Sequence, residues 1–269
     1  MTGIRRRGLI FAGFLAAAAS ARGQAPVSPP VRPTPWTLDL STFYQALDNG
    51  YGDWQGAGLR LSYTSPHVSP FVGVSFQRRD AGSQASVGVG SYVTLDAHNY
   101  IIAGVSSAPS GDVVLFPKVR YDIGLFSDTR VVPGLVWDVG FTQLSFGGGS
   151  TGSIISTGPI YYHGPLILSG SIRLNHDGVG GENSLSGEVG GQYGSQGRQW
   201  VGGRVGYGHE AYEILAATPL SVHLTDVSGS AFYQRWVTTK TALLGRINYE
   251  HKLTAYQSWG LELGYSVEF

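Results

Sequence analysis

The sequence predicts an all-β fold, a transmembrane antiparallel β-barrel of about fourteen strands that follows a cleaved signal peptide. Three observations support this prediction. The N-terminal residues have the pattern of an export signal, apolar residues alternate with small or polar ones from Trp36 to Phe269, and only 13% of the residues are charged. Soluble proteins average about 25% charged residues, so this chain is poorly suited to a fully solvated surface.

The composition also excludes several classes of function. The chain has 269 residues, with 18 basic and 18 acidic side chains and no basic run beyond Arg5 to Arg7. Nucleic acid is therefore not an expected partner, because it is bound by clustered basic side chains. The chain has no Cys, which excludes disulfides, thiol nucleophiles and thiolate metal sites. A chain of this length fits a single barrel domain.

The N-terminal segment predicts export across the inner membrane. Arg5 to Arg7 precede an apolar stretch at 8–19, and Ala19-Ser20-Ala21 supplies the small residues of a cleavage site. As a helix the apolar stretch spans about 18 Å, too short for a hydrocarbon core of roughly 30 Å. We therefore expect a signal peptide at 1–21, with a cleavage site nearer Gly23 as the alternative. The Pro-rich segment 22–35 is expected to be an extended periplasmic tether.

The domain that follows, 36–269, has a repeat of two residues throughout. In 118–124, Val119, Tyr121 and Ile123 alternate with charged residues and Gly, which is the pattern of a strand with one apolar face. The expected strands are 36–48, 54–64, 68–79, 84–94, 98–108, 112–125, 129–146, 150–162, 165–176, 183–194, 199–209, 221–236, 241–252 and 258–269. Merging two weak hairpins leaves twelve strands as the alternative.

The connections between these strands alternate in character. The even-numbered ones are short, as at Ser127-Asp128 and His163-Gly164, whereas several odd-numbered ones are longer, as at 210–220. Bacterial outer-membrane barrels have an even number of strands, short periplasmic turns and longer external loops. The sequence therefore predicts a location in the outer membrane.

Either the apolar or the polar face of the strands could be the outer face of the barrel. A soluble secreted barrel would turn its apolar face inward and carry a charged exterior, but here the polar face consists mainly of Gly and Ser with few charges. That face suits a confined lumen. Aromatic residues near the expected strand ends are predicted to lie at the two membrane–water interfaces: Trp36, Trp54, Tyr161, Tyr162, Trp200, Trp236 and Trp259.

The last strand ends on an aromatic residue. Its alternating apolar side chains are Trp259, Leu261, Leu263, Tyr265, Val267 and Phe269. In a closed barrel this strand pairs with the first, so no edge remains exposed. The pattern resembles the C-terminal signal that outer-membrane proteins present to the barrel-assembly machinery. Expected partners are therefore that machinery, outer-membrane lipid and lipopolysaccharide.

Several short motifs resemble the YaiO family of outer-membrane β-barrels. They are Gly208-His-Glu-Ala-Tyr212, Asp226-Val-Ser228, Gln234-Arg-Trp236 and Gly264-Tyr-Ser-Val-Glu-Phe269. The resemblance implies an outer-membrane location and surface exposure of some loops, and it implies no particular reaction. One departure is His209, at a position where Arg is expected.

The charged residues on the inward face are the main candidate functional residues. They are Arg60, Lys118, Arg120, Asp122, Asp138, Arg173, Glu188, Arg204, Arg246, Glu250 and Glu262. Such charges either pair across the lumen and close it or line an aqueous path. The first hypothesis is therefore a protein without enzymatic activity, acting as a narrow pore or a surface-exposed scaffold. A link to envelope polysaccharide is an analogy with other barrels.

The alternative hypothesis is a lipid or lipopolysaccharide hydrolase with its site at the outer rim. The candidates are His176, His209 and Glu210, with Ser150, Ser153, Ser184 or Ser186 as nucleophile. However, adjacent residues on a strand point to opposite faces, so His176-Asp177 and His209-Glu210 cannot form side-chain pairs without a bulge. The seven His are scattered without metal-ligand spacing, and neither a metal nor a cofactor is expected.

Overall fold

The computed structural model describes residues 35–269 except 51, 110–114, 147–148, 179–180, 182, 214–219 and 254, and it leaves undescribed the side chains of 210–213 and 220–224. The expected signal peptide and almost all of the expected tether lie outside these residues. The chain forms fourteen strands: β1 (Trp36–Leu47), β2 (Trp54–Tyr63), β3 (Val68–Arg79), β4 (Gly82–Thr94), β5 (Asn99–Ser107), β6 (Val119–Asp128), β7 (Leu135–Ser145), β8 (Thr151–His163), β9 (Leu166–Asp177), β10 (Asn183–Ser195), β11 (Gln199–Glu213), β12 (Leu220–Trp236), β13 (Thr241–Lys252) and β14 (Tyr256–Glu268).

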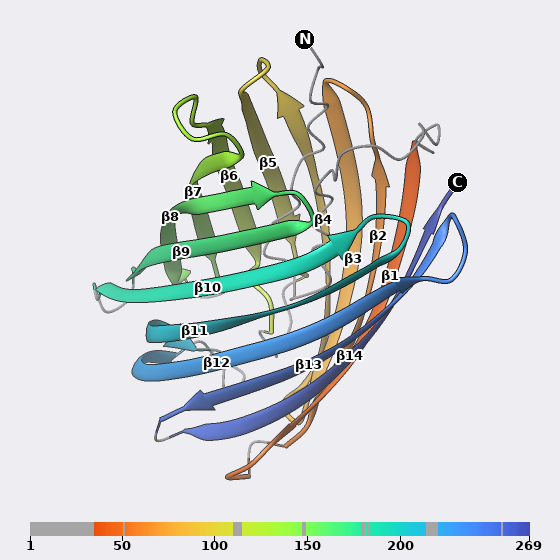
Figure 1. Cartoon of the computed structure of the whole chain (residues 1–269). Coiled ribbons are helices and arrows are strands. Elements are labelled where there is room, and N and C mark those ends of the chain that lie inside the picture. The colour runs from red at the N-terminus through yellow and green to blue at the C-terminus, as the bar shows by residue number, and fades with distance from the viewer. Residues whose placement is uncertain are drawn as a thin grey trace.

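The strands form a closed antiparallel barrel in which each strand pairs with its neighbours in sequence and β1 pairs with β14. Leu40 faces Tyr265 across this closing pair, and backbone hydrogen bonds join Trp36 to Phe269 in both directions, at 3.3 and 3.1 Å. In Figure 1, β2 to β5 stand steeply while β9 to β12 run across the view at a large angle to them, and β14 lies alongside β1. The prediction of a closed barrel with fourteen strands is confirmed, and twelve is wrong.

The two ends of the barrel differ in their connections. We call the end with both barrel termini and the even-numbered connections the turn end, and the opposite end the loop end. The turns at 164–165 and 196–198 are short. At the loop end, β11 and β12 extend beyond their pairing with β10 and β13, because β10 stops pairing at Gly208 and β13 stops at Asp226. The ends of these two strands, 209–213 and 220–225, therefore pair only with each other.

Three predicted connections differ from the structure. The strand expected from 112 begins at Val119, and β11 continues to Glu213 rather than ending at 209. Ser127 and Asp128 are the last residues of β6, and the connection to β7 instead spans 129–134. Pro133 lacks a backbone N–H and Gly134 has a φ of +84°, so this segment ends the ladder. The backbone N–H of Thr129 donates to the Leu135 carbonyl at 2.8 Å and closes the turn.

The apolar face of the wall is the outer face. Large apolar side chains with alternate parity are exposed around the barrel, among them Val74 (43%), Ile123 (54%) and Val205 (60%). Such an exterior is unfavourable in water and is the one that a membrane barrel presents to lipid. The alternative of a soluble secreted barrel is therefore wrong. Within the part of the chain that the structure describes, no helix is long and apolar enough to cross a membrane.

Candidate functional site

The inner wall carries ion pairs of three kinds, and the first lies on one strand. Arg120 and Asp122 are two residues apart on β6, and the guanidinium donates two hydrogen bonds to Asp122 Oδ1, at 2.7 and 3.0 Å, and one to Oδ2 at 2.8 Å. Thr142 on β7 donates to the same carboxylate at 2.7 Å. Both charged side chains are 22% exposed, so this pair borders the lumen and keeps some contact with water.

The second group joins β9, β10 and β11. Glu188 lies between two arginines, with Arg173 at 3.8 Å and Arg204 at 3.6 Å. The arginine side chains are 40% and 34% exposed, against 18% for the glutamate. Asp138, from β7, lies close enough to Arg173 for their charges to attract. The two arginines and the two carboxylates balance in charge, and because the arginine side chains are partly exposed, this part of the lumen is in contact with water.

The third pair is buried. Arg246 on β13 donates to Glu262 on β14 at 2.9 Å, and their side chains are only 9% and 5% exposed. The guanidinium also lies 5.7 Å from the centre of the Phe232 ring. A buried pair of this kind tolerates the loss of one partner poorly, since the other charge stays in a low dielectric.

A further charged group lies toward the loop end. Only one of its charged members, Glu250, was predicted. Glu250 accepts a hydrogen bond from the Tyr256 hydroxyl at 3.1 Å and lies 3.6 Å from Lys252. Arg79 stacks over the Trp54 ring at 3.6 Å. The sequence analysis missed Arg79 and Lys252, although each shares the inward parity of its strand.

Two of the predicted lumen charges lie in other settings. Arg60 on β2 stacks over the Phe71 ring at 3.9 Å. Lys118 precedes the first residue of β6 and is exposed. The remaining members of the predicted set belong to the ion pairs or lie beside them.

A cluster of apolar side chains lies on the inner side of the wall near the turn end. The buried members come from β4 to β9 and β11, with exposures of 3–8%: Tyr92, Ile102, Phe126, Val136, Ile160, Ile167 and Trp200. Partly buried apolar side chains pack against them from β3, β5, β8 and β12: Phe71, Tyr100, Tyr162, Phe232 and Trp236. We call the full set the apolar layer. The buried members of the apolar layer have little contact with water.

The prediction that the aromatic residues near strand ends lie at the membrane–water interfaces is only partly right. Trp36 and Trp259 are exposed on the outer face as expected, at 40% and 63%. Trp54 and Trp200 are instead buried, at 6% and 3%, while Tyr162 and Trp236 pack against the apolar layer. The parity of Trp200 with Arg204 on β11 already indicates an inward direction.

The predicted rim residues do not form His–carboxylate pairs in the part of the chain that the structure describes. His176 is exposed, whereas its neighbour Asp177 is 3% exposed on the inner face. His209 Nδ1 lies 3.0 Å from Thr225 Oγ1, and the side chain of Glu210 lies outside the described residues. Among the described residues no group of three His, Asp, Glu or Cys side chains is arranged to hold a metal ion.

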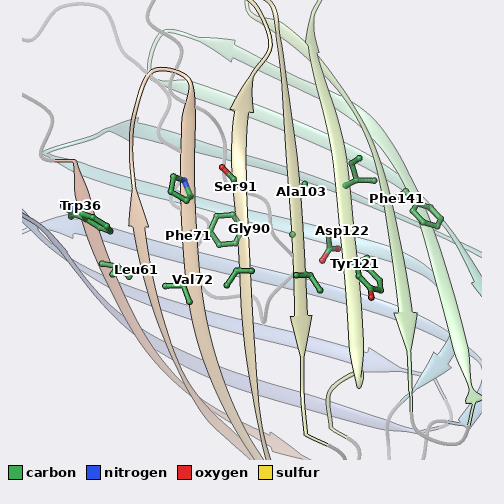
Figure 2. Close-up of a pocket in the computed structure, with 15 residues that line it drawn as sticks. Trp36, Leu61, Phe71, Val72, Gly90, Ser91, Ala103, Tyr121, Asp122 and Phe141 are labelled. Carbon is green, nitrogen blue, oxygen red and sulfur yellow. The ribbon is translucent and has the colours of Figure 1, made fainter.

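The outer wall has a shallow depression of about 920 Å³ over β1 to β7. Figure 2 shows small residues, Gly90, Ser91 and Ala103, between the larger Phe71 and Tyr121. Most of the lining side chains belong to the lipid-facing set. The depression therefore faces the lipid rather than the lumen.

The fold and its two faces define an integral β-barrel protein of the bacterial outer membrane. Residues 36–213 match the family described as "YaiO membrane beta barrel domain", and the chain belongs to this family. The resemblance that the motifs predicted is therefore confirmed. Of those motifs, Gly208 to Tyr212 lies within the matched residues and the other three lie beyond them. Comparison with curated protein sequences gave no significant match.

Solved structures with a similar fold include three outer-membrane proteins. The "Bacterial polysaccharide outer membrane secretin" has a TM-score of 0.58 at 6% identity, covering 88% of this chain and 99% of that one. The "CymD monoaromatic hydrocarbon channel" has a TM-score of 0.56 at 8% identity, covering 88% and 89%. Omp33 of Acinetobacter baumannii has a TM-score of 0.50 at 10% identity, covering 88% and 100%. At these identities the likeness concerns the fold alone.

Proposed function

We propose that this outer-membrane barrel is a narrow pore whose lumen is closed at rest by the apolar layer. The observation that carries the proposal is the hydrated group of Arg173, Glu188 and Arg204, because a lumen filled only for stability has no need of exposed charges. Side-chain charges set the selectivity of barrel pores, and apolar constrictions close pores by excluding water. The structural relatives named as channels share the architecture that this function requires.

The expected change in selectivity follows from the balance of charge in this group, in which two arginines offset two carboxylates. In a barrel opened by Trp200→Ala, the double variant Arg173→Ser/Arg204→Ser leaves Glu188 and Asp138 without these cations, so the ion preference shifts toward cations. The measurement is the reversal potential of single channels in a planar bilayer under a KCl gradient.

A matched control replaces two arginines that are exposed on the outer face, Arg78 and Arg235, by Ser in the same background. The reversal potential should not change in this control. Equal shifts in both double variants, or no shift in either, would contradict the assignment of the conducting path.

We also propose that the last strand is read by the barrel-assembly machinery, as the resemblance of its pattern predicts. Trp259, Leu261 and Leu263 are exposed to lipid at 63%, 50% and 55%, and Phe269 is 53% exposed. The Phe269 ring therefore contributes little packing to the finished barrel and is available to a partner.

Phe269→Ala should lower the amount of barrel assembled in cells several-fold and leave the stability of the refolded barrel nearly unchanged. The backbone hydrogen bonds to Trp36 do not depend on the side chain, which is the reason for the second expectation. The measurements are heat-modifiable mobility of membrane fractions on gels and urea unfolding of purified protein. Glu268→Ala, at the neighbouring position, is the control, and equal losses in both variants would refute the proposal.

Export by the N-terminal signal and a link to envelope polysaccharide both stay predictions. The relative named as a polysaccharide secretin is 6% identical to this chain, so its substrate does not carry over. The outer-membrane location itself rests on the family and the fold.

A further inference from the structure

A short polar row interrupts the lipid-facing wall near the loop end. Four residues on consecutive strands, all with outward parity, lie side by side: Gln143 on β7 faces Ser153 on β8, Ser153 faces His176 on β9, and His176 faces Asn183 on β10. Residues directly opposite each other in an antiparallel pair have Cβ atoms about 4.5–5.5 Å apart. The row therefore places a hydroxyl, an imidazole and an amide within reach of one another.

One bond in this row orients the imidazole. His176 Nδ1 lies 3.1 Å from Asn183 Oδ1, and an amide oxygen can only accept. Nδ1 therefore carries the proton and Nε2 is left as the acceptor. The two ring nitrogens point away from each other, so Nε2 is directed away from Asn183 and β10. This is the arrangement in which an imidazole acts as a general base.

The register selects one serine from the four that the sequence offered. Ser184 and Ser186 have inward parity on β10, and Ser184 is 6% exposed and bonded to Asn175. Ser150 lies in the connection before β8. Only Ser153 shares the outer face with His176 and lies directly opposite it. The histidine and the serine thus lie opposite each other on neighbouring strands rather than on one strand.

The depth of the row identifies the class of substrate. Two residues further from the loop end, the same four strands present an apolar row, Phe141, Ile155, Leu174 and Leu185, with exposures of 42%, 51%, 44% and 57%. The polar row therefore lies at the boundary where the lipid-facing band ends. Ester groups of membrane lipids occupy this interfacial layer, between acyl chains and head groups.

We propose that Ser153, His176 and Asn183 form a catalytic site that hydrolyses acyl esters of outer-membrane lipids. Ser153 Oγ attacks the ester carbonyl carbon while its proton passes to His176 Nε2. The tetrahedral intermediate expels the alcohol, which takes that proton, and leaves an acyl group on Ser153. Water, activated by the same imidazole, then releases the fatty acid and restores the serine. Asn183 is a positioning residue, because it holds the tautomer and orientation of His176.

This activity does not depend on the pore, because the row lies on the outside of the wall. Conductance and ester hydrolysis can therefore be tested in the same purified full-length protein. A failure of the pore proposal would leave the hydrolase proposal standing, and the reverse also holds.

The first experiment uses a fluorophosphonate probe on the refolded full chain, with the labelled peptide identified by mass spectrometry. We expect one label, on Ser153, which is absent in Ser153→Ala and slowed about 10²- to 10⁴-fold in His176→Ala. Ser107→Ala and His163→Ala are matched controls. Ser107 is exposed on the outer face without a histidine opposite, and His163 is exposed at the turn end. Heat-modifiable mobility shows that each variant is folded.

The second experiment measures fatty-acid release from phosphatidylethanolamine vesicles and from purified lipopolysaccharide in separate arms, which distinguishes the two sources of the ester. Asn183→Asp places a carboxylate beside the imidazole and favours its protonated form, so the pH of half-maximal activity should rise, whereas Asn183→Ala should lower kcat without that rise. Labelling that is independent of His176, absence of labelling, or release from neither lipid would overturn the proposal.

Discussion

Trp200→Ala is expected to turn an electrically silent barrel into a conducting one. Trp200 is 3% exposed and belongs to the apolar layer. Removing its indole opens space within the apolar layer. The free-energy cost of bringing water into a wider constriction is lower. We expect steady single-channel currents in a planar bilayer, where the unmodified protein gives none or rare brief openings.

The control for this experiment is Trp200→Phe, which keeps an aromatic side chain in the apolar layer and should stay silent. Trp200→Ala also removes core packing, at a cost of about 3–5 kcal/mol, so the variant must show the gel mobility of a folded barrel. If folded Trp200→Ala and folded Phe126→Ala both give no current, the lumen is closed elsewhere. That result would refute the proposal that the apolar layer closes it.

Arg246→Ala is expected to cause the largest loss of stability among the charged residues. It removes the guanidinium that donates to Glu262 and leaves that carboxylate in a site where its side chain is 5% exposed. Removing one partner of a buried ion pair lowers the free energy of unfolding by about 3–5 kcal/mol. The measurement is the free energy of unfolding in urea for protein refolded into detergent or vesicles.

Two comparisons test the physical reason. Arg120→Ala should cost about 1 kcal/mol, because that pair is 22% exposed and Asp122 keeps its bond from Thr142. The double variant Arg246→Met/Glu262→Gln should be more stable than Arg246→Ala, since no charge is then left buried. Equal losses for Arg246→Ala and Arg120→Ala would show that burial does not set the strength of these pairs.

The strand pattern could be predicted because membrane barrels impose a strict repeat of two on their sequences. The expected bounds of β3 and β13 agree with the structure residue for residue. The error at 127–134 arose because Val131 and Val132 continue an apolar pattern through a turn that Pro133 and Gly134 produce. The sequence pattern therefore predicts strands well. It predicts the position of a turn poorly where apolar residues continue into that turn.

Less of the candidate site could be predicted. Inward charges followed from parity, but their partners depend on cross-strand register and curvature, so the pairing of Glu188 with two arginines required the structure. Trp200 was assigned to a membrane interface because aromatic residues at strand ends are typical there, although its parity pointed inward. Ser153 and His176 are far apart in sequence, and only the register of β8 with β9 makes them neighbours.

The pairing of β1 with β14 also constrains how the barrel folds. Thr37 lies opposite Glu268, so the contact that seals the wall joins residues from the two extremes of the domain. Folding that depends on such distant contacts is slow, since the entropy of a long loop is lost before the contact forms. Until that moment the sheet has two unpaired edges that invite aggregation. Conditions that delay closure should therefore favour misassembled oligomers over monomeric barrels.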